Sequence, residues 1–195
     1  MSLLDLYNNT EKNLVEKPTI KLFENLKWKT FDAFNEFESG ISSLNREERN
    51  EVVLVSRLRN SLIKLNPTIP KDSIFEVIEE FTRDRSKMST IKANEEIYKF
   101  IKDGMNIKIQ RENEENYEKI FFIDWNNIEN NDFLLVSQLW LVGDFHTRRP
   151  DLILFINGIP LVIIELKNPV EDIKSGFDDN ITDYKDTIPQ LFFYN

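Results

Sequence analysis

The stretch RPDLILFINGIPLVIIELKNP, residues 149–169, carries the strongest fold signal in the sequence. Two short apolar runs, residues 152–156 and 160–164, flank the pair Asn157-Gly158, which favours a tight turn between antiparallel strands. Neither run alternates with polar residues, so both faces of the hairpin are expected to be covered. The stretch predicts a central pair of strands in an α/β sheet with helices packed on each side.

Three charged residues, Asp151, Glu165 and Lys167, lie at the ends of this apolar hairpin. An ionised group at the rim of a core is normally paired or bound to a metal, because burying it alone is costly. Side chains alternate along a strand, so Glu165 and Lys167 are expected to share a face. Whether Asp151 joins them depends on the turn.

The length of the turn sets the partner of Asp151. A two-residue turn without a compensating bulge places Asp151 opposite Ile164, on the other face from Glu165. A three-residue turn, with Gly158 left-handed in a bulge, places Asp151 opposite Ile163 and diagonal to Glu165, within about 7–8 Å. We expect the three-residue turn, because only this register of the two gathers the charges at one site.

Two carboxylates at that spacing can hold one hard divalent cation, and oxygen ligands with retained waters suit Mg²⁺. The backbone carbonyl of Leu166, which lies between Glu165 and Lys167, is a further candidate ligand. Lys167 is then placed to orient or activate a bound water, or to stabilise charge on a phosphate.

Pro150-Asp151, followed after the hairpin by Glu165-Leu166-Lys167, matches the PD-(D/E)xK motif of nucleases. This motif is short, but here it lies on the predicted hairpin and inside a longer similar stretch. The surrounding sequence resembles the N-terminal region of the R, or restriction, subunit of type I restriction endonucleases. The resemblance implies a restriction-endonuclease-like α/β fold with a mixed central sheet flanked by helices.

The resemblance covers most of the chain, including residues 49–66 and the final YKDTIPQLFFYN. It implies Mg²⁺-dependent hydrolysis of double-stranded DNA after translocation by an ATP-driven motor in the same subunit. The resemblance also implies separate modification (M) and specificity (S) subunits that choose the site. The sequence contains no GxxxxGK[ST] phosphate loop, so ATP is expected to bind only elsewhere in the parent subunit.

The resemblance also suggests supporting site residues. Some PD-(D/E)xK enzymes add an acidic metal ligand from the first helix; Glu16 matches it, with Glu11 as a rival and a solvated glutamate as the plain alternative. Type I R subunits commonly carry Gln-x-x-x-Tyr after the lysine, and the corresponding positions here are Asn180 and Tyr184. Asparagine keeps the amide but has one methylene less reach, so a role in positioning DNA competes with a purely structural one.

Basic residues precede the motif in the loop GDFHTRR. Arg148 and Arg149 are candidates for phosphate contact at the rim of the site, although pairing with local acids explains them as well. His146, the only histidine, is more simply interpreted as a surface residue than as a base.

The bulk composition sets limits on the function. A protein that binds DNA unaided usually has an excess of basic residues, whereas this chain has a net charge of −9. DNA is therefore expected to be delivered by other domains. The absence of cysteine excludes disulfides and thiolate metal sites and favours a cytoplasmic location. No apolar run is long enough to predict a membrane span.

We expect one nuclease domain over residues 1–195, with a helical insertion at about 45–103 and a β-rich core at about 104–195. The strand-like ending LFFYN suggests a fragment of a larger motor-nuclease subunit. An edge strand or structured loop is expected over residues 28–37. Helices are expected over residues 10–26, 46–65, 72–85, 90–102 and 172–186, and strands before the hairpin over residues 105–110, 119–124 and 133–142. Because of Pro18, the first helix either begins at Lys17 with proline in its first turn or is kinked there.

Two other functions remain open from the sequence. One is a different PD-(D/E)xK nuclease, of the resolvase or repair type. The other is a docking module without catalysis, in which the three charges form only a buried ion-pair network.

Overall fold

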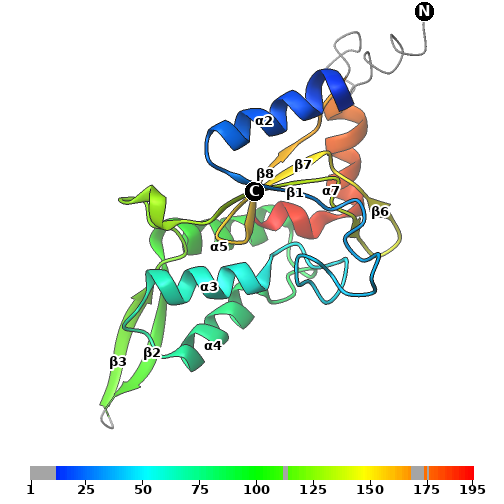
Figure 1. Cartoon of the computed structure of the whole chain (residues 1–195). Coiled ribbons are helices and arrows are strands. Elements are labelled where there is room, and N and C mark those ends of the chain that lie inside the picture. The colour runs from blue at the N-terminus through cyan, green and yellow to red at the C-terminus, as the bar shows by residue number, and fades with distance from the viewer. Residues whose placement is uncertain (1–11, 112–113, 168–173, 175) are drawn as a thin grey trace, which may run out of the picture.

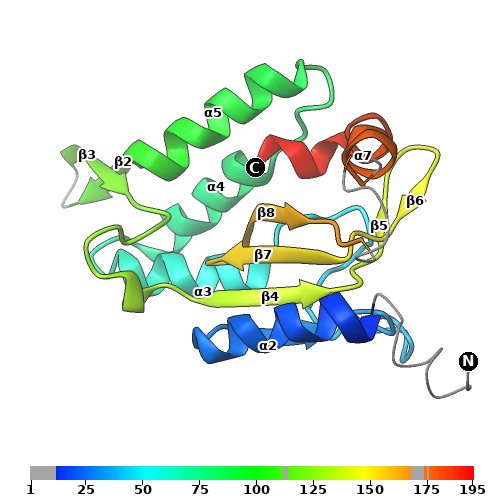
Figure 2. The ribbon, with the colours of Figure 1, turned by 90° about the horizontal axis from the view of Figure 1, so that it is seen from above.

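The structure is a computed structural model, which describes residues 12–111, 114–167, 174 and 176–195. A four-stranded sheet lies between two layers of helices, with α2 on one side and α3, α4 and α5 on the other (Figure 1; Figure 2). This arrangement confirms the predicted mixed α/β fold.

The hairpin consists of β7 (Leu152–Ile156) and β8 (Ile159–Ile164), paired antiparallel. Its turn has two residues, Asn157 and Gly158, both left-handed with φ of 54° and 83°. Two consecutive left-handed residues match the twist of the flanking strands, as in a type I′ turn. The expected three-residue turn is therefore wrong.

A bulge in β8 compensates for the shorter turn. Phe155 pairs with Pro160, but the next residue of β7, Leu154, pairs with Val162. Leu161 is thus an extra residue on β8, and it shifts every later pair by one position.

Beyond the bulge, the last strand pair is Leu152 with Ile164. The next two residues, Asp151 and Glu165, therefore lie directly opposite each other. The partner expected for Asp151 was Ile163, which lies two residues before Glu165 in the chain. The two carboxylates nevertheless share one face, because paired residues of a ladder point the same way.

The sheet has the order β1-β4-β7-β8. Strand β1 (Lys29–Asp32) runs parallel to β4 (Phe133–Ser137), and β4 runs antiparallel to β7. An edge strand was one of the two predictions for residues 28–37, and β1 confirms it. Of the hairpin strands, only β7 is central; β8 lies at the other edge of the described sheet, so the expectation of a central pair is half right.

The smaller apolar cluster packs α2 (Lys17–Asn25) against the sheet. Side chains of alternate sheet positions form its buried part: Leu135, Leu152, Leu154 and Leu166. Pro18 lies in the first turn of α2, where its missing N–H costs nothing. A π-helical segment, Lys12–Glu16, precedes α2, and α2 itself begins at Lys17, which confirms one of the two predictions for this helix.

The opposite face of the sheet supplies Ile153 and Phe155 to the larger cluster. The helices that cover it are α3 (Val55–Leu65), α4 (Lys71–Thr82) and α5 (Thr90–Asp103). Ser89 caps α5 by accepting a hydrogen bond from the Lys92 N–H.

Helix α3 begins nine residues later than predicted. Arg46 is buried and paired with Glu36, which holds the preceding segment in an irregular path. The Leu54 N–H donates to the Gly158 carbonyl at 2.8 Å, so the start of α3 is fastened to the hairpin turn.

A separate two-stranded ladder, β2 (Met105–Arg111) with β3 (Glu114–Ile120), projects from the helical layer (Figure 1). The strand predicted over residues 119–124 is therefore displaced toward the N-terminus. The predicted strand over residues 133–142 is interrupted after β4 and resumes as β5 (Leu141–Val142), which pairs with β6 (Thr147–Arg148).

The C-terminal segment is helical. It contains a π-helical turn (Gly176–Ile181), α7 (Thr182–Thr187) and a 3-10 helix (Pro189–Phe193). The prediction of a strand-like ending is therefore wrong. Phe192 and Phe193 lie in the 3-10 helix and are buried in the larger cluster. Residue 172, the predicted start of the last helix, lies outside the described residues. No helix of the described part of the chain has the length and apolar character that crossing a membrane requires.

Candidate active site

The carboxylates of Asp151 and Glu165 meet where β7 begins and β8 has just ended. The Asp151 N–H donates to Glu165 Oε1 at 3.2 Å, and the Leu166 N–H donates to Asp151 Oδ2 at 2.8 Å. These crossed hydrogen bonds hold the two acids directly opposite each other, whereas the sequence analysis expected them on one face but diagonal to each other.

Glu16 and Gln138 join this pair from two other elements. Gln138 Nε2 donates to Glu16 Oε2 at 3.3 Å and to Asp151 Oδ1 at 3.4 Å. Glu16 is only 7% exposed, and the Gln138 side-chain amide links its carboxylate to that of Asp151. Its predicted rival Glu11 is outside the described residues.

Sequence reasoning missed Gln138. The residue follows β4 directly and has a left-handed backbone, with φ of 57°. A polar residue after the apolar run of β4 is the only sequence signal of its presence, and such residues commonly just end strands.

Asn180 and Tyr184 approach Glu165 from the C-terminal helical segment. Asn180 Nδ2 donates to Glu165 Oε2 at 2.8 Å, and the Tyr184 hydroxyl also interacts with this carboxylate. The shorter asparagine therefore reaches the site directly. The structure gathers both residues of the Gln-x-x-x-Tyr-like element around one catalytic candidate.

Burial is the main cause that raises the pKa of Glu165, and the negative charge of Asp151 raises it further; hydrogen bonds from Asn180 and Tyr184 partly oppose the change. Burial also raises the pKa of Tyr184, with a further contribution from the Glu165 charge. Tyr184 therefore keeps its proton at neutral pH.

The side chain of Leu166 packs on the α2 side of the sheet, among the smaller apolar cluster. Lys167 is next in the chain and is half-buried. The buried leucine thus anchors the segment that carries the lysine.

The basic loop residues are engaged in local contacts. Arg148 forms a two-pronged ion pair with Asp183, and the Arg149 guanidinium lies 5.0 Å from the Phe34 ring centroid and 4.8 Å from that of Trp140. A phosphate would have to compete with Asp183 for Arg148. His146 is exposed, in agreement with its interpretation as a surface residue.

The oxygen atoms of Asp151 and Glu165 suit a hard cation. The four carboxylate oxygens accept one hydrogen bond each, from Gln138, Leu166, Asp151 or Asn180, and Glu165 accepts a further one from Tyr184. An ionised carboxylate oxygen has two acceptor directions, so three of the four oxygens keep one for a metal. Within the described parts of the chain, no three carboxylate, histidine or cysteine side chains form a preformed metal cage.

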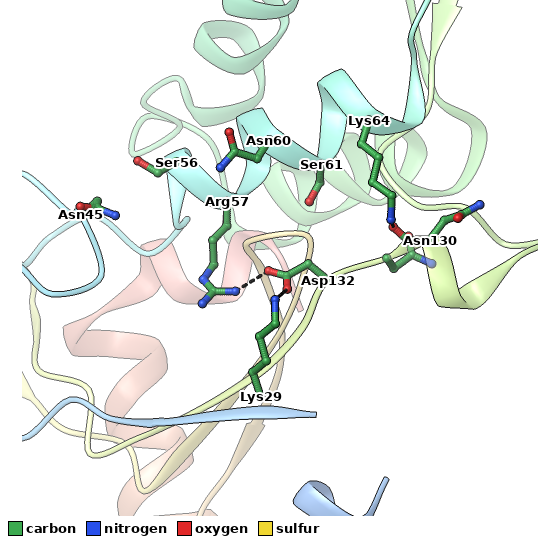
Figure 3. A pocket seen from close by; sticks show the side chains of 10 residues that line it. Lys29, Asn45, Ser56, Arg57, Asn60, Ser61, Lys64, Asn130 and Asp132 are labelled. Atoms are coloured by element: carbon green, nitrogen blue, oxygen red, sulfur yellow. Dashed lines mark hydrogen bonds and ion pairs between the residues drawn. The ribbon is translucent and has the colours of Figure 1, made fainter. Parts of the chain in front are cut away.

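A second polar site lies at the other end of β4, in a pocket of about 500 Å³ (Figure 3). Asp132 accepts a hydrogen bond from Lys29 Nζ at 2.6 Å and is also paired with Arg57. Lys64 Nζ donates to the Asn130 carbonyl at 2.7 Å. These contacts fasten α3 to β1 and to the start of β4, so they serve the fold.

Comparisons with known proteins identify the family of the chain. Residues 8–195 match the family described as type I restriction enzyme R protein N terminus. The chain is 31% identical over 188 residues to the type I restriction enzyme HindI endonuclease subunit of Haemophilus influenzae, covering 94% of this chain and 18% of that protein. It is 29% identical over 154 residues to the putative type I restriction enzyme MjaIXP endonuclease subunit of Methanocaldococcus jannaschii, covering 76% and 15%.

The chain spans less than a fifth of the length of either relative. The match nonetheless extends over almost the whole chain, including every residue of the candidate site. The chain belongs to the family formed by the N-terminal region of the R protein of type I restriction enzymes.

Proposed function

We propose that this chain is the Mg²⁺-dependent nuclease module of a type I restriction enzyme R subunit and hydrolyses phosphodiester bonds of double-stranded DNA. The register of β7 and β8, which sets the Asp151 and Glu165 carboxylates opposite each other, is the observation that carries the proposal. The endonuclease subunits to which the chain is similar support the reaction class.

Asp151 and Glu165 would hold Mg²⁺, with the Leu166 carbonyl and Glu16 as further ligands. When bound, the ion supplies positive charge beside the phosphate and a more acidic water. Lys167 contributes a fixed cation at the same place, which holds the attacking water or stabilises negative charge that develops at phosphorus.

Asn180 and Tyr184 orient Glu165. Both groups are donors at neutral pH, since the raised pKa of Tyr184 keeps its hydroxyl protonated. They hold the carboxylate in place and also border the space that a DNA strand would enter. Arg148 and Arg149 lie on the adjoining loop as weaker candidates for DNA contact.

The net negative charge of the chain indicates that DNA cleavage and DNA delivery are carried out by different domains. With a net charge of −9, the module repels phosphates except where a cation is bound. We infer that DNA is brought to it by an ATP-driven motor elsewhere in the subunit, and that M and S subunits select the sequence. ATP binds to the motor, and the enzyme works in the cytoplasm.

The test is DNA cleavage by the full-length R subunit assembled with its M and S partners. Asp151→Asn and Lys167→Ala should each lower Mg²⁺-dependent cleavage by at least about 100-fold, because each removes a group needed at the reacting phosphate. DNA-stimulated ATP hydrolysis should remain, since it occurs in other domains.

Asp144→Asn provides the control, because it removes one exposed negative charge from the neighbouring loop without touching the site. If the Asp151 and Lys167 variants cleave like the parent enzyme, the charges form only a structural network and the proposal is wrong. A parent enzyme that cuts equally well without divalent cations would also contradict it.

A further inference from the structure

Gln138 has a backbone conformation that side chains usually avoid. Its φ of 57° lies in the left-handed region, which favours glycine. Its N–H donates to the Asp151 carbonyl at 2.9 Å, so the left-handed residue is fastened directly to the catalytic segment. Glycine would adopt this backbone conformation without strain, so the presence of glutamine suggests that its side chain has a role at this position.

The side-chain amide of Gln138 joins two carboxylates. Its nitrogen lies 3.3 Å from Glu16 Oε2 and 3.4 Å from Asp151 Oδ1. Ionised carboxylates only accept hydrogen bonds, so the NH₂ end of the amide must face them and can give one hydrogen to each. The residue is 9% exposed, so water competes little for these bonds.

We propose that Gln138 is a positioning residue that holds Glu16 near Asp151, so that the Glu16 carboxylate can join Asp151 and Glu165 when a divalent cation binds. This inference rests on the proposed nuclease function. It explains how Glu16, at the junction of the π-helical segment and α2, is tied to a site built on β7 and β8.

The chemistry of the amide suits this task better than the alternatives. Lysine or arginine would bring a positive charge that competes with the metal for the same carboxylates. Glutamate would add a fourth negative charge with no hydrogen to donate. A neutral double donor holds both acids and leaves their charge available to a cation.

The first experiment uses the full-length R subunit and measures binding of Ca²⁺, a probe that takes oxygen ligands. Gln138→Leu removes both hydrogen bonds at similar volume and should weaken binding about 10-fold to 100-fold, as for other residues that orient metal ligands. The Mg²⁺ concentration for half-maximal cleavage should rise in parallel. Gln190→Leu is the matched control, because it removes an amide bonded to the Val142 carbonyl outside the site.

A second variant separates positioning from folding. Gln138→Gly relieves the left-handed backbone but also removes the amide, so it should fold and still bind Ca²⁺ weakly. Lys27→Gly relieves another left-handed residue, with φ of 68°, and should leave binding unchanged.

Combining variants tests the link to Glu16. Glu16→Gln alone should weaken Ca²⁺ binding, but added to Gln138→Leu it should weaken binding by no more than about twofold, because the carboxylate is already released. If the two losses multiply in full, or if Gln138→Leu and Gln138→Gly bind Ca²⁺ like the parent, Gln138 does not position Glu16. A parent subunit with neither cation binding nor cleavage would instead refute the nuclease function itself.

Discussion

The paired acids explain why charge is placed at the rim of an apolar hairpin. Asp151 and Glu165 hold each other through backbone N–H groups, and Gln138 and Asn180 donate to the remaining oxygens. Hydrogen bonds reduce the cost of burying the carboxylates but do not remove their mutual repulsion. A cation bound to both carboxylates, as we propose, would offset this repulsion.

Glu165→Gln should make the metal-free chain more stable at neutral pH. The pKa of Glu165 in the folded protein is raised above 4.5, chiefly by burial and then by the charge of Asp151. The folded state thus holds the proton more tightly than the unfolded state, and the wild-type protein loses stability as pH rises through that interval. The variant has no proton to lose there.

Urea unfolding in chelator at a series of pH values measures this difference. The two proteins should converge below about pH 4, where Glu165 is protonated in both states. Added Mg²⁺ should then stabilise the wild-type chain more than the variant. A variant that is less stable than wild type at neutral pH without metal would contradict the expected sign.

The acids and the lysine can be recognised from the sequence because their spacing and their apolar setting are both local. Gln138 cannot, since its role depends on a left-handed backbone after β4 and on a contact with Glu16, 122 positions away. Residues that act through such distant contacts leave little trace in local sequence patterns.

At the scale of elements, Gly158 of the hairpin turn packs closely against the start of α3. A Cβ added to Gly158 would lie 2.5 Å from the Leu54 carbonyl oxygen and 2.8 Å from the Leu58 nitrogen, and φ is +83°. Gly158→Ala should therefore destabilise the chain by about 2–5 kcal/mol, from backbone strain and overpacking together.

Gly40→Ala is the matched control for this prediction. Gly40 has nearly the same φ, +81°, but nothing lies within 4 Å of an added Cβ. Its substitution should cost only the backbone term, about 1–2 kcal/mol. Equal losses for the two variants in urea unfolding would show that the contact with α3 is unimportant.

The bulge predicts unequal effects for two deletions of similar size. Removing Leu161 deletes the extra residue, so the regular ladder that remains still sets Asp151 opposite Glu165. Removing Leu154 from β7 instead sets Asp151 opposite Ile164. Cleavage by the assembled enzyme should fall by less than about 10-fold in the first case and become undetectable in the second.

Circular dichroism spectra of both deletion variants serve as the folding check. Equal loss of cleavage in two folded variants would argue against the register as the basis of the site.

The hairpin and the helices α4 and α5 follow closely from apolar spacing and turn residues, because their signals are local. The segment before α3 does not become helical, because Arg46 finds a buried partner in Glu36 and Leu54 bonds to the hairpin turn. The turn and the bulge together could not be predicted, since a two-residue turn and a three-residue turn suit Asn157-Gly158 equally well.

At the scale of the whole molecule, Asp132 joins the two layers. It is paired with Lys29 of β1 and Arg57 of α3, while its own N–H donates to buried Asn157 of the turn (Figure 3 shows the two ion pairs). Burial would raise the pKa of Asp132, but hydrogen bonds and charge from Lys29 and Arg57 outweigh it and lower the pKa below 3.8.

Asp132→Asn should destabilise the chain by about 1–3 kcal/mol at neutral pH, because Arg57 loses its charged partner. The carboxylate contributes stability above its unfolded pKa of 3.8, and this contribution is lost as pH falls through the lower folded pKa. Urea unfolding should therefore show a difference between wild type and variant at pH 7 that narrows below about pH 4.

Glu129→Gln, which neutralises an exposed acid near the same loop, should have little effect at any pH. A loss of stability in Asp132→Asn that stays constant down to acid pH would mean that shape, and not charge, accounts for the role of Asp132.

The bulge at Leu161 also acts as a phase shift between the two strands. A ladder repeats every two residues, and one extra residue delays β8 by half a period relative to β7. This shift places Leu166 in the smaller apolar cluster and Glu165 on the same face of the sheet as Asp151. Any change in the number of strand residues between the turn and Glu165 would therefore keep the two acids opposite each other only if a bulge is gained or lost with it.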